Sequence, residues 1–455
     1  MNTEHKNFSF TVKTLGCKVN QHEADAIIAD LEDAGFRYVS PDEKSDIFII
    51  NTCTVTGRAA MQARQAIRRA IRRNPDARIV VTGCYAQTEP DEIGKIPGVH
   101  HIVGQSDKHR ISRLLRAVET GGGPRTFTKP VKAISDIRET RHFYPVSTTA
   151  MGKRTRPYLK IQDGCNAFCT YCIVPYARGR SRSLAINDVI ALVEGIHGAG
   201  YLETVLTGIH VGCYGTDLNP PTNLYHLLRR ILEETGIPRI RLSSIEPLEL
   251  TSDIIGLAAD SIRFCHHFHI PLQSGDNGIL HRMNRPYTAE YYRDLVRTIH
   301  RQIPDCGIGS DVLSGFPGET PEAFENTFNL LEDLPITYLH VFPFSPRKGT
   351  QAEKFPNRVS SSVIKERCHA LRLMGIRKKK AFFEKQVGKR VEVLIEGNSS
   401  PQHGRLKGMT KNYIPVRVRG PERIKNQIVT VEIQDMVFQN IESGSMYLDG
   451  FRVSS

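Results

Sequence analysis

Three apolar runs that alternate with two amphipathic stretches constrain the fold of residues 8–118 more than any other feature of the sequence. The apolar runs are FTVKTLGC, SDIFIINTC and ARIVVTGC, and the stretches between them are NQHEADAIIADLEDAG and GRAAMQARQAIRRAIRR. The runs are typical of strands and the stretches of helices. Strands that alternate with helices predict a doubly wound parallel sheet.

Each of the three predicted strands ends in a cysteine, and these are Cys17, Cys53 and Cys84. Ligands of doubly wound sheets gather at the carboxyl ends of the strands, so we expect the three thiols to lie together at that edge. Three thiolates that leave one position open suit an iron–sulfur cluster with an exchangeable iron, or a catalytic zinc ion. Three buried cysteines without a ligand are the alternative, because cysteine is often buried.

A second cysteine set lies in QDGCNAFCTYC, where Cys165, Cys169 and Cys172 have the spacing C-x₃-C-x₂-C. Spacing this short lets one loop surround a metal centre with three thiolates. A structural zinc site would need a fourth protein ligand, for which His197 or His210 is available. A cubane cluster held by three cysteines would instead leave one iron open to an outside ligand.

Residues 150–384 continue the alternation of strands and helices, which predicts a partial (β/α)₆ barrel. The strand-like runs are RPYLKIQDG, TVLTGIHVG, RIRLSSIEP, HHFHIPLQSG, GIGSDVLSGFP and YLHVFPFSP, and INDVIALVEGIHGAG and PEAFENTFNLLEDL are examples of the helices. Barrel active sites lie at the carboxyl ends of the strands. Residues 119–149, which contain TGGGPRTFTKP, are predicted to be a turn-rich linker that lets the sheet sit over the barrel mouth.

Residues 385–452 change to short alternating strands with glycine and proline turns, VEVLIEG, IPVRVRG, QIVTVEIQDMVF and SMYLDGF. This pattern predicts a small antiparallel all-β barrel. Arg405, Lys407 and Lys411 are basic, and the lead-in RKKKAFFEKQVGKR is basic with two phenylalanines. Basic side chains near aromatic ones suit RNA. For the two phenylalanines, a place in the core is the favoured alternative.

The whole chain is basic, with 455 residues, a formal net charge of +13 and a pI near 9.3. This balance favours a polyanionic partner such as nucleic acid. Residues 57–73 carry six arginines around an apolar stripe. Like charges repel one another unless an anion lies nearby, so Arg68 and Arg72 are candidates for RNA contacts. A solvated basic helix face is the alternative.

The location and redox state also follow from the sequence. No apolar run approaches the roughly 18 residues of a membrane span, and the start, MNTEHKNFSF, lacks the layout of a signal peptide. We therefore expect the protein in the cytoplasm. In that reducing compartment its ten cysteines suit metal ligands or small buried side chains better than disulfides.

The three parts together resemble a known family. The C-x₃-C-x₂-C spacing with an aromatic residue before the last cysteine resembles the radical S-adenosylmethionine superfamily, and the all-β tail resembles the TRAM RNA-binding domain. The whole chain is similar to the methylthiotransferases. Within them, TLGCKVNQHEAD is most similar to the branch that acts on N6-threonylcarbamoyladenosine beside the tRNA anticodon, in its bacterial form, since the chain stops at FRVSS without an anchor. The isopentenyladenosine branch tends to read YGCQMN, and the ribosomal-protein branch LGCPKN.

The resemblance implies two four-iron, four-sulfur (4Fe-4S) clusters, an auxiliary one on the first cysteine set and a radical one on the second. S-adenosylmethionine would bind the radical cluster, a radical would attack C2 of the adenine ring, and sulfur from the auxiliary cluster would be transferred in methylated form. An electron donor is implied, and no catalytic acid–base pair is required. By resemblance, Tyr171 and Gly208 would contact the cofactor. Ser243, Gln273 and Asp311, which are expected at later strand ends, are further candidates for contacts with the cofactor or substrate.

Two alternatives to this function remain at the level of sequence. The first is methylthiotransfer to isopentenyladenosine in tRNA or to an aspartate of a ribosomal protein, since ribosomes are polyanions too. The second is a non-catalytic RNA-binding protein that is stabilised by zinc on the same cysteines.

Overall fold

The computed structural model describes residues 8–120, 129–144, 154–400, 404–440 and 443–453. The chain forms two compact units. Unit 1 comprises Met1–Gly152, Lys160–Leu184 and Ser345–Glu353, and unit 2 comprises Lys153–Leu159, Ala185–Phe344 and Lys354–Ser455. Most of the predicted linker segment TGGGPRTFTKP lies outside the described residues.

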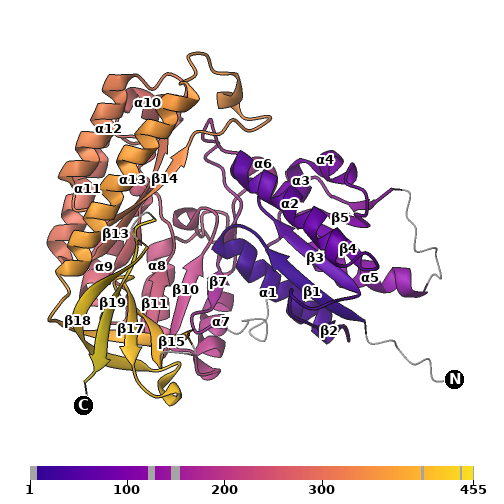
Figure 1. The fold of residues 1–455 in the computed structure, drawn as a ribbon, viewed down its shortest axis with the longest axis horizontal. Helices are drawn as coiled ribbons and strands as arrows, with labels where there is room; N and C mark the ends of the chain where they lie inside the picture. Colours follow the sequence, from indigo (N-terminus) through magenta and orange to yellow (C-terminus); the bar gives the residue numbers. More distant parts are fainter. Residues whose placement is uncertain (1–7, 121–128, 145–153, 401–403, 441–442, 454–455) are drawn as a thin grey trace. The chain divides into compact units, whose positions relative to one another are not determined.

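Unit 1 contains a parallel sheet whose strands follow the order β2-β1-β3-β4-β5-β6 (Figure 1). These strands are β1 (Ser9–Thr14), β2 (Arg37–Tyr38), β3 (Ile47–Thr52), β4 (Arg78–Gly83), β5 (His101–Val103) and β6 (Val131–Ala133). The three predicted strands are therefore β1, β3 and β4, which are neighbours in the sheet. The other three are too short for their periodicity to be visible in the sequence.

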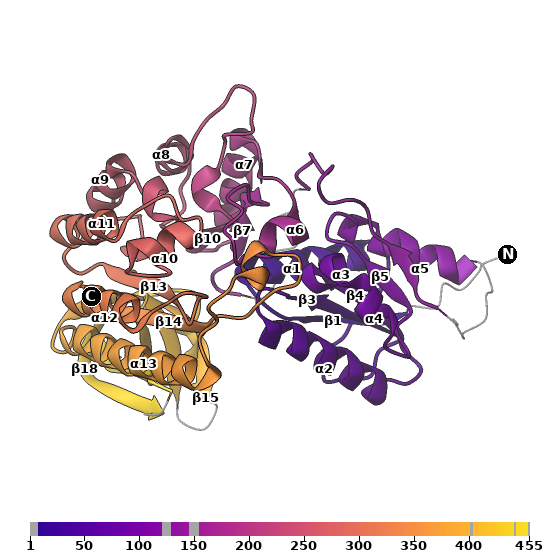
Figure 2. The same ribbon diagram turned by 90° about the horizontal axis from the view of Figure 1, so that it is seen from above.

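Helices cover both faces of this sheet (Figure 2). Side chains alternate along β3, so that Phe48 and Ile50 belong to one core cluster while Ile47 and Ile49 belong to the other. The first cluster contains side chains of α2 (Gly57–Arg73), α3 (Cys84–Thr88) and α4 (Pro90–Gly94), and the second contains those of α1 (Lys18–Asp33) and α5 (Ile111–Thr120). The predicted doubly wound architecture is confirmed.

Unit 2 contains the partial barrel. Its strands form two parallel groups, β11-β10-β7 and β12-β13-β14, which isolated bridges connect. The strands are β7 (Tyr158–Lys160, with Lys160 in unit 1), β10 (Glu203–Thr207), β11 (Arg239–Leu242), β12 (His267–His269), β13 (Gly307–Ser314) and β14 (Tyr338–Pro343). The helices between them are α7 (Ile186–Gly198), α8 (Leu224–Glu234), α9 (Ser252–Asp260), α10 (Asn277–Arg282), α11 (Ala289–Gln302) and α12 (Pro321–Asp333). The predicted partial barrel of six strands is confirmed.

A long helix, α13 (Ser361–Glu384), leads to a closed barrel of five strands in the order β15-β16-β17-β19-β18. They are β15 (Arg390–Ser400), β16 (Arg405–Thr410), β17 (Pro415–Arg419), β18 (Ile428–Asn440) and β19 (Ser445–Arg452). The predicted all-β barrel is confirmed, but not its purely antiparallel pairing, because β17 and β19 are parallel. The sequence also gave no sign of β16, whose outward side chains are basic and which contains a glycine.

A buried arginine, which is paired with a glutamate of the partial barrel, joins the five-stranded barrel to the rest of unit 2 by backbone hydrogen bonds. The guanidinium of Arg241 on β11 donates to Glu203 at 2.8 Å and to the backbone carbonyls of Thr410 and Lys411 at 3.0 and 2.9 Å. Arg241 is 1% exposed and Glu203 is fully buried. Burial alone would raise the pKa of Glu203, but the positive charges of Arg241 and Arg156 outweigh this effect and lower the pKa. These contacts fix the five-stranded barrel against the carboxylate-bearing strand β10.

Across the described ranges, no helix combines the length and the apolar character that a membrane crossing needs.

Candidate metal centre

The first cysteine set lies at one edge of the sheet in unit 1. Cys17 is the N-cap of α1, Cys53 directly follows β3, and Cys84 is the first residue of α3 after β4. Because β1, β3 and β4 are adjacent and parallel, their carboxyl ends bring the three residues to neighbouring positions. Cys17 is exposed, whereas Cys53 and Cys84 are buried.

Two glycines allow the chain to pack closely at this edge. Gly16 and Gly83 have φ values of +105° and +97°, which favour glycine. A Cβ on Gly16 would lie 2.7 Å from Cβ of Cys53 and 3.0 Å from its Sγ, and a Cβ on Gly83 would lie 2.4 Å from the Thr52 carbonyl oxygen. The glycine before each of Cys17 and Cys84 is therefore what lets these turns reach the end of β3.

Side-chain hydrogen bonds hold the three strand ends together. The Asn20 amide donates to the carbonyl oxygens of Leu15 and Thr52 at 2.8 and 3.1 Å, and the Asn51 amide donates to the Asn20 carbonyl at 2.8 Å. The Thr52 hydroxyl donates to the Thr82 carbonyl at 2.5 Å. Asn20, Asn51 and Thr52 are fully buried, so these bonds rigidly position the turns that carry the thiols.

The surroundings of the buried thiols do not favour free thiolates. Burial and the neighbouring Cys84 raise the pKa of Cys53 to about 12. Burial also raises the pKa of Cys84, although the positive charges of Arg178 and Lys108 oppose the shift. A bound metal centre removes such protons because its own charge stabilises the thiolate.

The second cysteine set lies in the loop after β8 (Gln162–Asp163), also in unit 1. The Cys165 amide donates to the Gly179 carbonyl at 3.0 Å, and the Cys172 amide donates to the Cys169 carbonyl at 2.9 Å. Gly164 has a φ of +75°, and a Cβ there would lie 1.9 Å from the Arg180 carbonyl oxygen. The glycine of the DGC motif thus permits the crossing that closes the loop, and the three cysteines are each half-buried.

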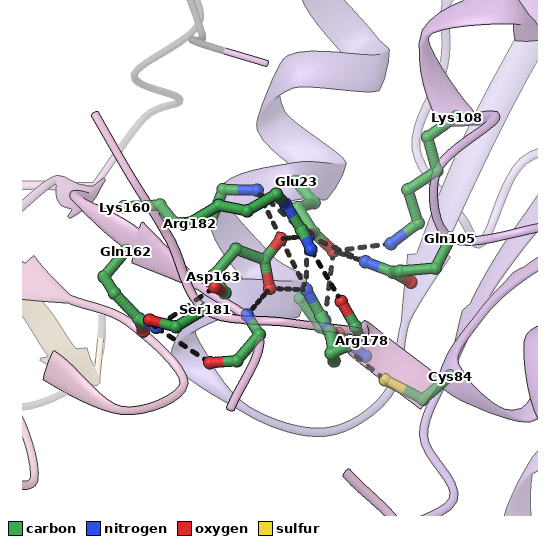
Figure 3. A network of polar contacts seen from close by, with 12 residues as sticks. Glu23, Cys84, Gln105, Lys108, Lys160, Gln162, Asp163, Arg178, Ser181 and Arg182 are labelled. Carbon is green, nitrogen blue, oxygen red and sulfur yellow. Dashed lines mark hydrogen bonds and ion pairs between the residues drawn. The ribbon is translucent and has the colours of Figure 1, made fainter. Parts of the chain in front are cut away.

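A network of buried charges adjoins the first cysteine set (Figure 3). At its centre is Arg178, the last residue of α6 (Val174–Arg178), which is fully buried. Its Nε donates to Sγ of Cys84 at 3.3 Å, and its other nitrogens lie 2.6 Å from a Glu23 oxygen, 3.2 Å from an Asp163 oxygen and 2.5 Å from Oδ1 of Asn20. Burial opposes the charge on Arg178, but Cys84 and the two acids outweigh it, so the pKa is raised well above its usual value.

The network contains more positive than negative charge. Lys108 and Lys160 lie 2.5 and 3.2 Å from Glu23, and Arg182 lies 3.6 Å from Asp163. The network thus has four cations, Lys108, Lys160, Arg178 and Arg182, for two acids, Glu23 and Asp163, and the side chains of all six are at most 10% exposed. A surplus of two buried positive charges is costly unless an anion lies nearby. Cluster-bound thiolates at Cys84 and its neighbours would supply that anion, so the residues present fit an anionic iron–sulfur cluster.

On its outer side the network borders a cavity of about 280 Å³. The cavity is lined by Glu23, Lys108, Lys160, Asp163 and Arg182 of the network, together with aromatic and helical residues such as His109, Phe143 and Tyr144. Arg178 is not among these lining residues. The two lysines therefore have an open side, whereas the guanidinium against Cys84 does not.

Four of the predicted cofactor contacts lie in unit 2 and one in unit 1. Gly208 and Ser243 directly follow β10 and β11, as predicted, and Tyr171 lies half-buried in the cysteine loop of unit 1. Gln273 lies beyond the end of β12 with a φ of +66° and pairs with Val312. Asp311 was expected at a strand end but lies inside β13, because β13 continues to Ser314.

Asp311 is held by two histidines that sequence reasoning did not single out. Its Oδ1 lies 3.0 Å from Nε2 of His269 and 3.2 Å from Nδ1 of His340 on the neighbouring strands. Burial opposes the charge of Asp311, but these histidines outweigh it, so its pKa is strongly lowered. A second such group is formed by His210, Cys213 and Glu249, with Sγ of Cys213 at 3.3 Å from Glu249. Neither group lies within one segment: His210 and Cys213 are three residues apart in sequence but Glu249 is distant, and Asp311, His269 and His340 come from three strands.

The candidate RNA contacts differ in their availability. Arg68 and Arg72 are exposed on α2, and five of the six arginines of that helix are exposed. On the five-stranded barrel Lys407 is exposed, whereas Arg405 pairs with Asp449 at 3.0 Å and Lys411 with Glu392 at 2.7 Å. The basic face of α2 thus offers the densest exposed positive charge among these candidates, although Arg73 lies 3.8 Å from Asp42.

Two family models match this chain. Residues 9–104 match the uncharacterized protein family UPF0004, and residues 159–331 match the radical SAM superfamily.

Relatives match over nearly the whole length. The threonylcarbamoyladenosine tRNA methylthiotransferase MtaB of Bacillus subtilis is 40% identical over 92% of each chain. The protein of the same name from Aquifex aeolicus is 38% identical, over 90% of this chain and 97% of its own. The tRNA-2-methylthio-N(6)-dimethylallyladenosine synthase of Alkaliphilus oremlandii is 32% identical, over 94% of this chain and 90% of its own.

Among solved structures, the radical S-adenosylmethionine methyltransferase TsrM of Kitasatospora setae, with cobalamin and a 4Fe-4S cluster bound, is similar in fold. The TM-score is 0.54 at 19% identity, over 74% of this chain and 75% of that one. Identity this low supports the fold and nothing further.

Proposed function

Because the chain belongs to the family of radical S-adenosylmethionine methylthiotransferases, we propose that it adds a methylthio group to C2 of N6-threonylcarbamoyladenosine in tRNA. The family predicted from the cysteine motifs is confirmed. The observation that carries the choice of substrate is the 35–40% identity, over 85–92% of this chain, to relatives that share this activity in their name.

The radical SAM family implies S-adenosylmethionine and a 4Fe-4S cluster. We assign that cluster to Cys165, Cys169 and Cys172, whose loop is closed by backbone hydrogen bonds. When bound, the cluster and S-adenosylmethionine supply the radical that removes a hydrogen atom from an unactivated carbon. Tyr171, Gly208, Ser243, Gln273 and Asp311 stay candidates for binding the cofactor or the substrate.

We further propose that Cys17, Cys53 and Cys84 hold a second, auxiliary 4Fe-4S cluster. Three features support this assignment: the thiols lie at adjacent strand ends, two glycines allow their approach, and a surplus of buried positive charge adjoins Cys84. Three cysteine ligands leave one iron position for the sulfur that is transferred. The protein's own residues position that site and exclude water from its buried side.

We also propose that tRNA binds to exposed basic residues, with Arg68 and Arg72 on α2 and Lys407 on the five-stranded barrel as the best supported positions. Arg405 and Lys411 are weaker candidates, because each already has an acidic partner. An electron donor is needed to reduce the radical cluster, and residues 8–118, 150–384 and 385–452 remain the proposed functional divisions of the chain.

Nucleoside mass spectrometry of total tRNA, from cells with and without the gene, tests the proposal. Loss of 2-methylthio-N6-threonylcarbamoyladenosine, with accumulation of the precursor that lacks the methylthio group, is the expected result. Complementation with the unchanged gene should restore the product. An unchanged tRNA profile would refute the proposed substrate.

A second candidate is methylthiotransfer to isopentenyl-type adenosine, because relatives named for that reaction are 31–33% identical to this chain. The same measurement separates the two, since loss of the methylthio group would then occur on the dimethylallyl nucleoside instead.

A further inference from the structure

One arginine connects the two cysteine segments of unit 1. Arg178 is six residues beyond Cys172 in sequence, at the end of α6, and its Nε donates to Sγ of Cys84, which is 94 residues away. The guanidinium belongs to the segment of the second cysteine set but contacts a cysteine of the first. Figure 3 shows it between Cys84 on one side and the carboxylates of Glu23 and Asp163 on the other.

Arg178 is held so that it cannot turn away from this sulfur. Its terminal nitrogens are bound by Glu23 on both oxygens, by Asp163 and by Asn20, and α1 and β8 carry these partners. The planar guanidinium fork is therefore fixed in orientation, with Nε directed at Cys84.

The charge of Arg178 is also poorly screened. The residue is fully buried and does not line the neighbouring cavity, whereas Lys108 and Lys160 do. Its two acidic partners are shared with three other cations, which leaves a net positive charge on the network. A positive charge in such a place acts strongly on any change of charge at the adjacent sulfur.

We propose that Arg178 is a positioning residue for an auxiliary cluster on Cys17, Cys53 and Cys84, and that its hydrogen bond and charge stabilise the reduced form of that cluster. This inference rests on the proposed function, because it needs the auxiliary cluster. Reduction adds negative charge to the cluster, so a fixed positive charge and an N–H donor at one ligand sulfur raise the reduction potential.

The test is a redox titration, followed by electron paramagnetic resonance, of the full chain with Cys165, Cys169 and Cys172 all changed to Ala. Only the first cysteine set can then hold a cluster. We expect Arg178→Gln to lower the reduced-to-oxidised ratio at a fixed potential about tenfold, which is about 59 mV for a one-electron couple. Iron content is measured on the same samples.

Two further variants distinguish the effects of the Arg178 charge and its contact with Cys84 from a general disturbance of the buried network. Lys160→Gln removes one buried cation from the same network, but Lys160 pairs with Glu23 and Asp163 rather than with Cys84. It should shift the potential by less than half as much as Arg178→Gln. Arg178→Lys keeps the charge without the fork, and its potential should lie closer to that of the parent.

An unchanged potential in an iron-loaded Arg178→Gln variant would overturn the inference while leaving the proposed function intact. Equal shifts in the Lys160 and Arg178 variants would also overturn it. If the parent with only the first cysteine set bound no cluster, both the inference and the auxiliary-cluster assignment would fail. If Arg178→Gln were the one variant to lose its iron, the reduction potential of Arg178→Lys would test the inference instead. A potential equal to that of the parent would then overturn the role proposed for the hydrogen bond of Arg178.

Discussion

Replacing Asp163 by Asn removes one of the only two acids in the buried network beside Cys84. Asp163 accepts from Lys160 at 3.1 Å, from Arg178 at 3.2 Å and from its neighbour's amide, Gly164 N–H, at 2.9 Å. An asparagine has the same shape but no charge. Four buried cations would then share Glu23 as their one remaining acidic partner in the network.

Two independent estimates give the size of the effect on the free energy of unfolding. Burial opposes the charge of Asp163, but Lys160 and Arg178 outweigh it and lower its pKa from the usual 3.8 to about 2. A difference of just under two pKa units corresponds to roughly 2–3 kcal/mol. Removing one partner of a buried ion pair costs about 3–5 kcal/mol. We therefore expect Asp163→Asn to destabilise unit 1 by about 2–5 kcal/mol.

The sign of the pH dependence follows from the same lowered pKa. Because the folded-state pKa is below the unfolded value, the contribution of Asp163 is complete above about pH 4. It is lost as the pH falls from 3.8 towards 2, where the folded-state carboxylate takes up its proton. The stability difference between the parent and the variant should therefore shrink over that interval.

Amide hydrogen exchange followed by mass spectrometry measures the effect in each unit separately. Peptides from β3 report on unit 1 and peptides from β10 on unit 2. A loss of about 2 kcal/mol corresponds to roughly 30-fold faster exchange in β3, and β10 should not change.

The matched control is Asp136→Asn, which also removes an aspartate of an ion pair in unit 1. Asp136 pairs with Arg138 at 2.6 Å, but the arginine side chain is 82% exposed. Because solvent screens this exposed pair, its loss should leave the exchange in β3 close to that of the parent. An increase of less than about threefold in the exchange of β3 for Asp163→Asn would refute the reasoning that the buried cations beside Cys84 depend on Asp163.

Three further predictions concern function and assembly. Cys17→Ala should abolish methylthiolation but leave some uncoupled cleavage of S-adenosylmethionine, whereas Cys169→Ala should abolish both; full methylthiolation by the Cys17 variant would exclude a role in the auxiliary cluster. Arg72→Glu should weaken tRNA binding about tenfold at low salt and reduce the salt dependence of binding. The control Arg301→Glu, at an exposed position of unit 2, should do neither. An equal loss of tRNA affinity in the two variants would argue against α2 as the contact surface. Glu203→Gln should leave Arg241, which anchors the five-stranded barrel, without its acidic partner and lower the free energy of unfolding by about 3–5 kcal/mol. Proteolysis after α13 should therefore be faster, and protease resistance like that of the parent would contradict this prediction.

Hydrophobic periodicity was sufficient to predict those helices and strands whose apolar residues are buried. The arginine-rich helix occurs as predicted at Gly57–Arg73, and its buried residues are Ala60, Ala63, Ile67 and Ala70, at helical spacing. The three cysteine-ended strands were visible for the same reason, because β3 is buried along its whole length. In contrast, β16 was missed because half-buried Arg405 and exposed Lys407 alternate with its buried positions, and two basic residues hide the apolar pattern.

The cysteines of the candidate site could be predicted because a motif or a strand end marks each one. Their surroundings could not, because Glu23 on α1 has no local mark that separates it from a solvated acid. The structure buries it against Arg178, which is 155 residues away. Long-range charge pairing of this kind depends on which segments pack together, and neither local propensity nor spacing contains that information.

This pairing has a consequence for how unit 1 assembles. Glu23 has Lys108 as a partner within the sheet segment, but its partners Lys160 and Arg178 belong to the segment of the second cysteine set. Conversely, Arg178 is buried only where Glu23, Asn20 and Cys84 of the sheet edge receive it. Removing these long-range partners from either buried side would cost several kcal/mol, so we expect the sheet edge and residues 160–184 to stabilise each other. We therefore expect a change in the charge at one set of cysteines to affect the packing of the other.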